Sequence, residues 1–257
     1  MWVTFKNFIK TALFILSITV LVYFSISFIQ SKRNLMDIEE YSPVSTLKIK
    51  ETLLTKSKYP FIDVHGHPFP TVISDLTQLV SEMDSLNMAF MVNLSGFRGL
   101  YLKKSLENVK KNAPTRFGLF LNLDFEKIDE KDFESNTLKI INDSYNQGVM
   151  GLKIYKSLGL TDKDSNGNRI KINDPRLKPI WELCGKLKIP ILIHSGDPEP
   201  FWSDKDKYNE RWLELRQKPG RYMGDSNKYP SFKEVISEQH DIFENNPETI
   251  FINAHLG

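Results

Sequence analysis

A chain of 257 residues, 40% of them hydrophobic, is long enough to bury a sizeable core and does not have the composition of a disordered protein. Its 34 basic and 32 acidic residues nearly balance, and no run of like charge is long enough to follow a nucleic-acid backbone. Nucleic acid is therefore excluded as a partner, whereas self-association stays open. The single cysteine, Cys184, excludes an internal disulfide and is expected to be buried on a helix.

An apolar segment lies close to the N-terminus. Residues from Thr11 to Ser31 carry no charge and are mostly Leu, Ile, Val and Phe, with Lys10 before them and Lys32 after them. About 20 such residues span a bilayer as a helix. The segment shows no amphipathic face, which argues against a buried core helix, and it has no clear small-x-small cleavage site, which argues against a removed signal peptide. We expect a single-pass membrane anchor over residues 1–33, with the following domain outside the cytoplasm.

The rest of the chain divides into a linker and one domain. Residues 34–58 are polar and mixed in charge, as expected of a linker, and residues 59–257 alternate between apolar runs and helical patterns. Six strands separated by five helices predict a parallel sheet with right-handed crossovers. The predicted strands are 61–64, 89–94, 117–121, 149–154, 189–193 and 249–253, and the predicted helices are 74–86, 100–112, 132–147, 180–187 and 232–245.

Two architectures fit this alternation, an open doubly wound sheet and a (β/α)8 barrel. A doubly wound sheet that binds a nucleotide has a Gly-rich phosphate loop after its first strand. This chain instead has His65-Gly66-His67-Pro68 there. The histidines favour the barrel, whose chemistry lies at the C-terminal ends of its strands.

Potential metal ligands lie at four of the predicted strand ends. His65, Lys153, His194 and His255 each lie at or just past the end of an apolar run, and His67 follows His65 by two residues. Residues i and i+2 of an extended backbone point to the same side, so both first-strand imidazoles can reach one cation. Imidazole suits zinc and neighbouring first-row metals. Any one of these histidines alone is more typical of an ordinary hydrogen-bonded residue, but together they predict a divalent metal site.

Lys153 is unusual because a lysine at the end of a buried strand is costly unless its charge is paired or removed. Addition of carbon dioxide to the amine would turn it into a carboxylate able to bridge two metals. Pairing with a carboxylate, or binding an anionic substrate, is equally open from the chemistry alone. Lys156, three residues further on, competes for the role of substrate contact.

Four segments together resemble the amidohydrolase superfamily of metal-dependent hydrolases. Asp63-Val64-His65-Gly66-His67 resembles its first-strand Asp-x-His-x-His signature, and Gly151-Leu152-Lys153-Ile154-Tyr155 its fourth-strand lysine segment. Ile193-His194-Ser195-Gly196-Asp197 is similar to its fifth-strand histidine segment. Asn253-Ala254-His255-Leu256-Gly257 is similar to the sixth-strand segment, especially in the amidohydrolase-2 (amidohydrolase-related) branch. The resemblance covers about residues 60 to 257 in the expected order.

The resemblance implies a (β/α)8 barrel of the TIM type that holds one or two divalent metals, zinc first and manganese as the alternative. Bound metal would activate a water molecule for attack. His255 and Asp197 are then the candidate catalytic residues. The family places a further aspartate at the end of strand eight, and neither that strand nor strand seven follows here, so we expect a barrel truncated after strand six. The implied metal ligands are His65, His67, Lys153, His194 and His255.

The connection from Asp197 to Ser231 is the longest between a strand and its helix, and such connections shape substrate pockets on this face of a barrel. Asn209-Glu210-Arg211 resembles a segment of close relatives, which makes Asp197, Trp202 and Arg211 candidate substrate contacts. The alternative is a solvated lid with a few packed aromatic residues.

These observations predict a membrane-anchored, metal-dependent hydrolase that cleaves an amide, ester or lactone-like bond of a small molecule. One alternative is a decarboxylase of the amidohydrolase-2 type, with a single metal, an uncarboxylated lysine and the strand-six histidine as acid or base. Another is a non-catalytic binding domain that keeps the ligands without the chemistry. The identity of the substrate does not follow from the fold.

Overall fold

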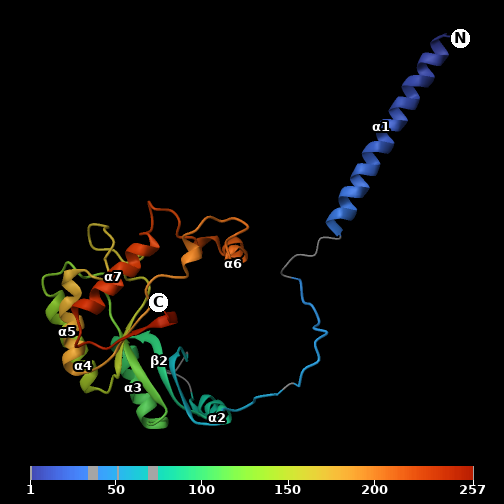
Figure 1. Ribbon diagram of the computed structural model, residues 1–257. Helices are drawn as coiled ribbons and strands as arrows, with labels where there is room; N and C mark the ends of the chain where they lie inside the picture. The colour runs from blue at the N-terminus through green and yellow to red at the C-terminus, as the bar shows by residue number, and fades with distance from the viewer. Residues whose placement is uncertain (1, 34–39, 51, 69–74, 257) are drawn as a thin grey trace. The chain divides into compact units, whose positions relative to one another are not determined.

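The computed structural model describes residues 2–33, 40–50, 52–68 and 75–256 (Figure 1). Contacts within the chain divide it into two units, Met1–Leu53 and Leu54–Gly257, and each is described by itself. The domain boundaries expected after residues 33 and 58 stay predictions.

The second unit is built on one parallel sheet of six strands in the order β1-β2-β3-β4-β5-β6. A doubly wound sheet would reverse its strand order part-way across. Consecutive order with right-handed crossovers instead places every connecting helix on the same face, which is the arrangement of a β/α barrel. The predicted barrel-type sheet is therefore confirmed. Its strands are β1 (Phe61–Gly66), β2 (Met88–Phe97), β3 (Phe117–Asn122), β4 (Gly151–Ile154), β5 (Ile191–Ile193) and β6 (Phe251–Asn253).

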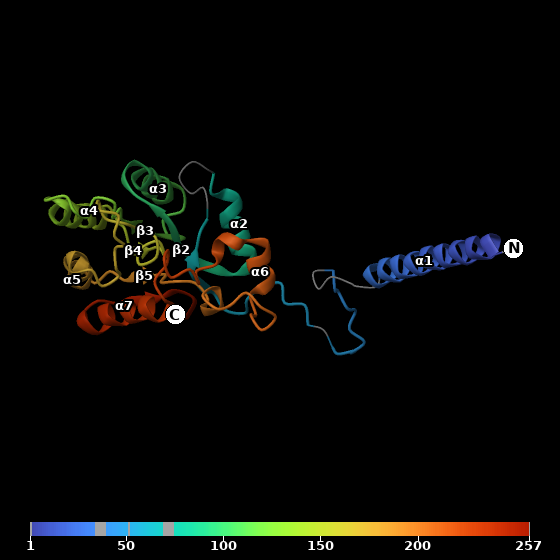
Figure 2. The ribbon, with the colours of Figure 1, turned by 90° about the horizontal axis from the view of Figure 1, so that it is seen from above.

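Helices cover the outer face of this sheet, and Figure 2 shows α3, α4, α5 and α7 in an arc around strands β2 to β5. The five predicted helices are present as α2 (Thr77–Leu86), α3 (Gly99–Asn112), α4 (Phe133–Asn146), α5 (Lys178–Leu187) and α7 (Phe232–Asn245). The start expected at Ser74 lies outside the described residues. The sequence did not predict α6 (Trp212–Gln217), a helix of six residues with one buried side chain and so too short to show a periodic pattern. Short 3-10 turns cover Pro175–Leu177, Glu199–Phe201, Pro219–Arg221 and Ala254–Leu256.

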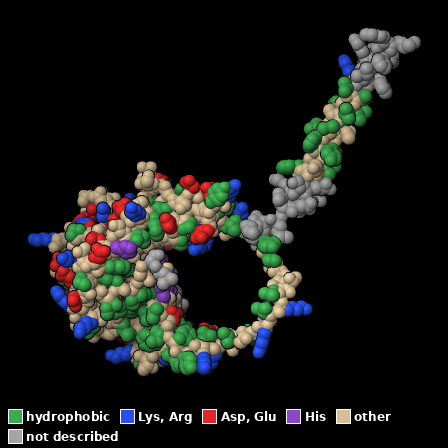
Figure 3. All heavy atoms as spheres, viewed as in Figure 1, with side chains coloured by type: hydrophobic (Ala, Val, Ile, Leu, Met, Phe, Trp, Pro, Cys, Tyr) green, Lys and Arg blue, Asp and Glu red, His purple; other side chains and the backbone are tan. Residues whose placement is uncertain are grey.

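The N-terminal unit contains helix α1 (Trp2–Arg33). Its stretch Lys10–Ile29 has a mean hydropathy of 2.4 and is not buried against other parts of the chain. Figure 3 shows hydrophobic side chains along this helix. Among the described residues it is the one helix long and apolar enough to cross a membrane, a test that a signal sequence also passes. The apolar N-terminal helix expected from the sequence is thus present.

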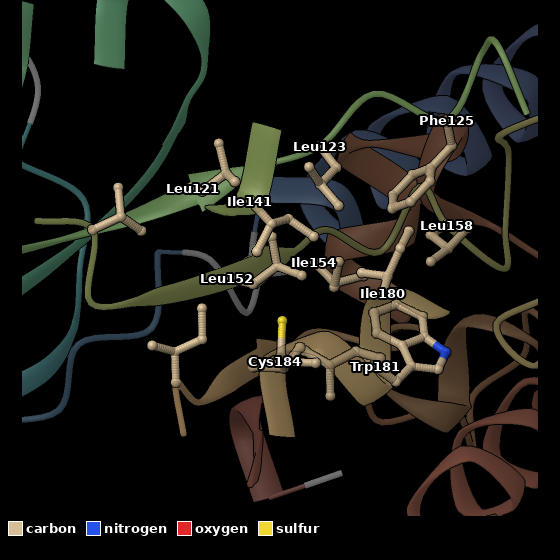
Figure 4. Packing of buried hydrophobic residues seen from close by; sticks show 14 of the residues in the cluster. Leu121, Leu123, Phe125, Ile141, Leu152, Ile154, Leu158, Ile180, Trp181 and Cys184 are labelled. Carbon is tan, nitrogen blue, oxygen red and sulfur yellow. The ribbon is translucent and has the colours of Figure 1, made fainter. Parts of the chain in front are cut away.

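The core between sheet and helices is well illustrated by α5. Its buried residues Ile180, Trp181 and Cys184 share one face, and the helix ends where Lys188 adopts a left-handed backbone with φ of 55°. Figure 4 shows Trp181 and Cys184 close to Leu152 and Ile154 of β4. Full burial of one such side chain stabilises the fold by roughly 1.5–3 kcal/mol. The same burial raises the pKa of the Cys184 thiol to about 12, so this cysteine is a packing residue, as expected.

The opposite face of the sheet has its own small apolar cluster. Leu94, Phe120 and Leu192 are buried there, on the face that also carries Lys153, because Lys153 alternates with the helix-facing Leu152 and Ile154. Gly151 is required beside Phe120, since a Cβ at that position would lie 2.4 Å from the phenylalanine ring. An apolar floor therefore lies beneath the ends of β3, β4 and β5.

A buried ion pair connects α7 to the segment that follows β4. The Arg169 guanidinium donates to both Glu238 carboxylate oxygens at 2.9 and 2.7 Å, and the Ile172 backbone N–H donates to Glu238 Oε2 at 3.1 Å. Only 5% of the Glu238 side chain is exposed. This carboxylate fixes the connection that leads from β4 to α5 against the helix before β6.

We expect Glu238→Gln to lower the free energy of unfolding by about 3 kcal/mol, because it leaves a partly buried guanidinium without its main charged partner. Urea denaturation of the full chain in detergent micelles, followed by tryptophan fluorescence, measures the effect. Glu244→Gln, at an exposed position of the same helix, is the control and should change the free energy by less than about 0.5 kcal/mol. Equal effects of the two variants would contradict the assigned role of Glu238.

Candidate functional site

The first two histidines lie at the C-terminal end of β1. The backbone N–H of His65 donates to Asp63 Oδ1 at 2.9 Å, and the ring centroids of His65 and His67 are 5.4 Å apart. Gly66 between them lies close to Met91 of β2, where a Cβ would come within 2.8 Å of the methionine side chain. The glycine thus lets β1 approach β2 while both imidazoles project from the strand end.

His194 and His255 follow β5 and β6. The His194 N–H donates to the Ile154 carbonyl at 3.1 Å, and His255 lies in a left-handed backbone conformation with φ of 60°. The His194 and His255 ring centroids are 4.6 Å apart, and those of His255 and His65 are 5.0 Å apart. In a flat sheet five strand spacings would separate β1 from β6 by about 24 Å. The sheet is therefore rolled, as in a barrel, and its first and last strand ends meet at one mouth.

Lys153 is buried among these strand ends with 1% of its surface exposed. Within the described part of the chain its Nζ has no hydrogen-bond partner, and it lies over the Tyr155 ring at 5.2 Å from the ring centroid. Tyr155 is held by a hydrogen bond from its hydroxyl to the Leu94 carbonyl at 2.6 Å. Burial lowers the pKa of Lys153 to about 8. No carboxylate among the described residues compensates this amine.

The same lysine acts on the histidines around it. Burial, followed by the positive charge of Lys153, lowers the pKa of His194 to about 4. The same two causes, in the same order, lower the pKa values of His65 and His67 below their ordinary range. These three imidazoles are therefore neutral near pH 7, and a neutral imidazole has the free lone pair that metal coordination requires.

The donor set suits a divalent metal by its chemistry. Four imidazoles form a row in the order His67, His65, His255 and His194, with successive ring separations of 5.4, 5.0 and 4.6 Å. The amine of Lys153 is buried beside them without a hydrogen-bond partner in the described chain. As they stand, no three His, Cys, Asp or Glu residues of the described ranges are grouped closely enough to hold a metal ion. The residues predicted as ligands therefore converge, and their coordination of a metal stays a prediction.

A cavity of about 710 Å³ lies beside His194 and His255. Lys156 and Asp197 line it, and the Lys156 ammonium donates to both carboxylate oxygens of Asp197, at 2.8 and 2.7 Å. Only 10% of the Asp197 side chain is exposed. Of the two lysines near the histidines, Lys156 is thus the one with a carboxylate partner. The other lining side chains include Glu199, Phe201, Arg211, Glu214, Arg221 and Phe232.

The long connection after β5 is fixed by its own polar contacts. Asn209 donates to the Pro200 and Asp204 carbonyls, and its side-chain oxygen accepts from the Arg211 N–H. The Trp202 indole donates to the Pro230 carbonyl at 2.8 Å and packs edge-on against Phe232. Trp202 is therefore part of the wall's support and is not among the side chains that line the cavity. Of the three contacts expected in this connection, Asp197 and Arg211 do line it.

Sequence reasoning missed Glu214 and Arg221, which line the same cavity, and Tyr155 beside Lys153. Glu214 lies one helical turn after Arg211, a spacing that brings the two side chains together once α6 is known to be helical. Tyr155 is two residues after Lys153 and so shares its side of an extended chain. The sequence signals that could have found these residues are those two spacings, whereas Arg221 reaches the cavity through the turn at Pro219–Arg221.

Comparison with known proteins adds neighbours at the level of structure. No family model matches this chain, and no curated protein sequence matches it. Among solved structures, an amidohydrolase from Mycobacterium avium subsp. paratuberculosis is 13% identical over 71% of this chain and 49% of its own, with a TM-score of 0.44. A second neighbour, 4-oxalomesaconate hydratase from Rhodopseudomonas palustris, is 13% identical over 76% of this chain and 62% of its own, with a TM-score of 0.42. A third, a probable 2-pyrone-4,6-dicarboxylic acid hydrolase from Acinetobacter baumannii, is 15% identical over 58% of this chain and 54% of its own, with a TM-score of 0.36.

The first of these neighbours is an amidohydrolase by name, and the other two are named as a hydratase and a probable hydrolase. The chain spans only about half to three fifths of their length. Because each TM-score is below 0.5, the barrel fold of this chain rests on its own strand order and on the meeting of the β1 and β6 ends.

Proposed function

We propose that this protein is a membrane-anchored, metal-dependent enzyme of the amidohydrolase type that hydrolyses an amide, ester or lactone-like bond in a small molecule. The observation that carries the proposal is the convergence of imidazoles from three strands, with ring separations of 5.0 Å for His65 and His255 and 4.6 Å for His194 and His255. They converge beside the buried, partnerless Lys153 amine and at the edge of a cavity that can admit a ligand.

In this proposal the ligands are His65, His67, His194 and His255, with Lys153 added if it is carboxylated. A divalent metal held by these residues, zinc or manganese, would supply an acidified water molecule and polarise the bond under attack. The lowered pKa values of His65, His67 and His194 leave these three imidazoles able to bind without first losing a proton. The apolar floor formed by Phe120 and Leu192 excludes water from the inner side of the site.

Asp197 is the proposed proton acceptor among this chain's residues. Its carboxylate lines the cavity next to His194, and the salt bridge from Lys156 to both oxygens holds it in place. His255, at the junction between the cavity and the histidine row, is the second group that can hold or release a proton there. The left-handed backbone of His255 supports this assignment, since strained residues other than glycine cluster at functional sites.

A decarboxylase is the second candidate, and one observation favours it. The Lys153 amine is buried without a hydrogen-bond partner among the described residues, and such desolvation favours a neutral amine that could serve a site with one metal without being carboxylated. Metal stoichiometry separates the two reactions, because a bridging carboxylated lysine requires two metals.

We expect the double variant His65→Ala, His67→Ala to retain less than about a tenth of the bound metal of the wild-type protein, because two ligands are removed at once. Mass spectrometry of metal content after purification with zinc measures this. His240→Ala, at an exposed position on α7, is the matched control and should keep its metal. Equal metal content in the double variant and the wild type would remove this site from the proposal.

We expect Lys153→Ala to lose at least one metal equivalent and to regain part of it when acetate is added, if the lysine is carboxylated and bridging. The reason is that a free carboxylate can then occupy the space of the missing one. Lys156→Ala, whose amine pairs with Asp197, should keep the full complement. Full metal content in Lys153→Ala would favour the single-metal decarboxylase over the hydrolase.

We propose that helix α1 anchors the protein in a membrane. The support for this is the uncharged stretch between Lys10 and Ile29, which is long enough to cross the hydrocarbon core of a bilayer as a helix. A bilayer span with a short amino tail would leave the second unit on the far side, which is the orientation that we propose.

We expect the intact chain to stay in the membrane pellet after washing with alkaline carbonate, because burying this apolar helix in lipid is effectively irreversible. Immunoblotting of pellet and supernatant measures the distribution. A shortened chain that starts at Leu35 should appear in the supernatant. Release of the intact chain by carbonate would contradict the anchor, and a shorter mature chain would identify α1 as a cleaved signal.

A further inference from the structure

Two arginines share one carboxylate on the wall of the cavity. Arg221 at the end of the Pro219–Arg221 turn donates to Glu214 Oε1, and Arg211 at the start of α6 donates to Glu214 Oε2 at 3.3 Å. Each oxygen of the Glu214 carboxylate thus accepts a hydrogen bond from one guanidinium group. The three side chains are 45%, 46% and 27% exposed for Arg211, Arg221 and Glu214, so solvent and solutes can reach them.

This group of three, here called the arginine fork, lines the same cavity as His194 and His255. Its two cations face one anion, which leaves one positive charge uncompensated within the fork. The third cation of the wall, Lys156, is already occupied by both oxygens of Asp197. The lining also contains the carboxylate of Glu199, for which no ion pair with either arginine is found in the described chain, so the fork is the part of the wall where cations outnumber their bonded anions.

The fork is held in place from behind. Leu215, between the two arginines in sequence, is buried with 1% exposure, and the Met223 N–H donates to the Phe201 carbonyl at 2.8 Å. Asn209 fixes the start of α6 through the Arg211 N–H at 2.8 Å. Guanidinium groups anchored in this way bind a ligand with less loss of conformational freedom than free surface arginines.

We infer that the arginine fork binds a carboxylate group of the substrate, and that Glu214 occupies this position while the cavity is empty. The inference rests on the proposed function, since the histidine row defines the reacting end of the same cavity. A carboxylate is the group assigned because the fork already holds one, and planar two-oxygen anions match paired guanidinium donors. The substrate class is then an acid whose carboxylate lies away from the bond that reacts.

The test is calorimetric titration of the full chain in detergent micelles with succinate, and with succinamide as its uncharged counterpart. Wild-type protein should bind succinate and give no signal with succinamide. Arg211→Gln and Arg221→Gln should each weaken succinate binding by about tenfold, the effect of one charge-assisted hydrogen bond. Arg216→Gln, on the same helix but outside the cavity lining, should leave it unchanged.

Glu214→Gln is the decisive variant because it should tighten succinate binding by about tenfold, since it removes the internal competitor for the same two guanidinium groups. A loss of folding cannot produce this gain. Succinate binding that is the same in the wild type and in the Arg211, Arg221 and Glu214 variants would overturn the inference.

The titrations are run with zinc-loaded and with chelator-treated protein. Failure of the arginine fork to bind a carboxylate can then be distinguished from failure of the proposed metal site to bind metal. Arginine-dependent binding by a protein that takes up no metal would support the fork and count against the hydrolase. Normal metal uptake with arginine-independent binding would leave the hydrolase and overturn the fork.

Discussion

The rolling of the parallel sheet is the constraint on which the site depends. Consecutive strand order places all connecting helices on one face, and packing them there curves the sheet toward the other face. That curvature brings His65 at the end of the first strand to within 5.0 Å of His255 after the last, measured between ring centroids. Residues nearly two hundred positions apart in the chain thus share one mouth because of the way helices cover a sheet.

Burial gives this mouth its chemistry. Leu94, Phe120 and Leu192 form an apolar floor on the face that carries Lys153, so its amine is shielded from solvent and has no hydrogen-bond partner among the described residues. The remaining charge then acts on His194, whose pKa is lowered first by burial and next by Lys153. An amine that is hard to keep charged and imidazoles that stay neutral are two results of one desolvated floor.

The sequence was sufficient for the strands and for the residues at their ends, because both depend on local patterns. Strand starts were less accurate: β5 begins at Ile191 and not at Ile189, since Pro190 has no N–H to donate to a neighbouring strand. Ile189 is buried all the same, and burial alone does not distinguish a paired strand from the turn that leads into it. The sequence predicted only some of the charged residues that line the cavity. Glu214 and Arg221 lie there because the hydrogen bonds of Asn209 and the burial of Leu215 fix the course of the chain, and no local sequence pattern predicts those contacts.

At position 255 the stability of the fold and the proposed chemistry of the site favour different residues. A left-handed conformation costs a residue with a side chain about 1 kcal/mol, and glycine adopts it without that cost. Selection of this chain for thermal stability alone would therefore favour replacing His255, and each success would remove the imidazole that links the first strand to the cavity. Engineering for robustness should hold position 255 fixed and look for its gains on the helices of the outer face.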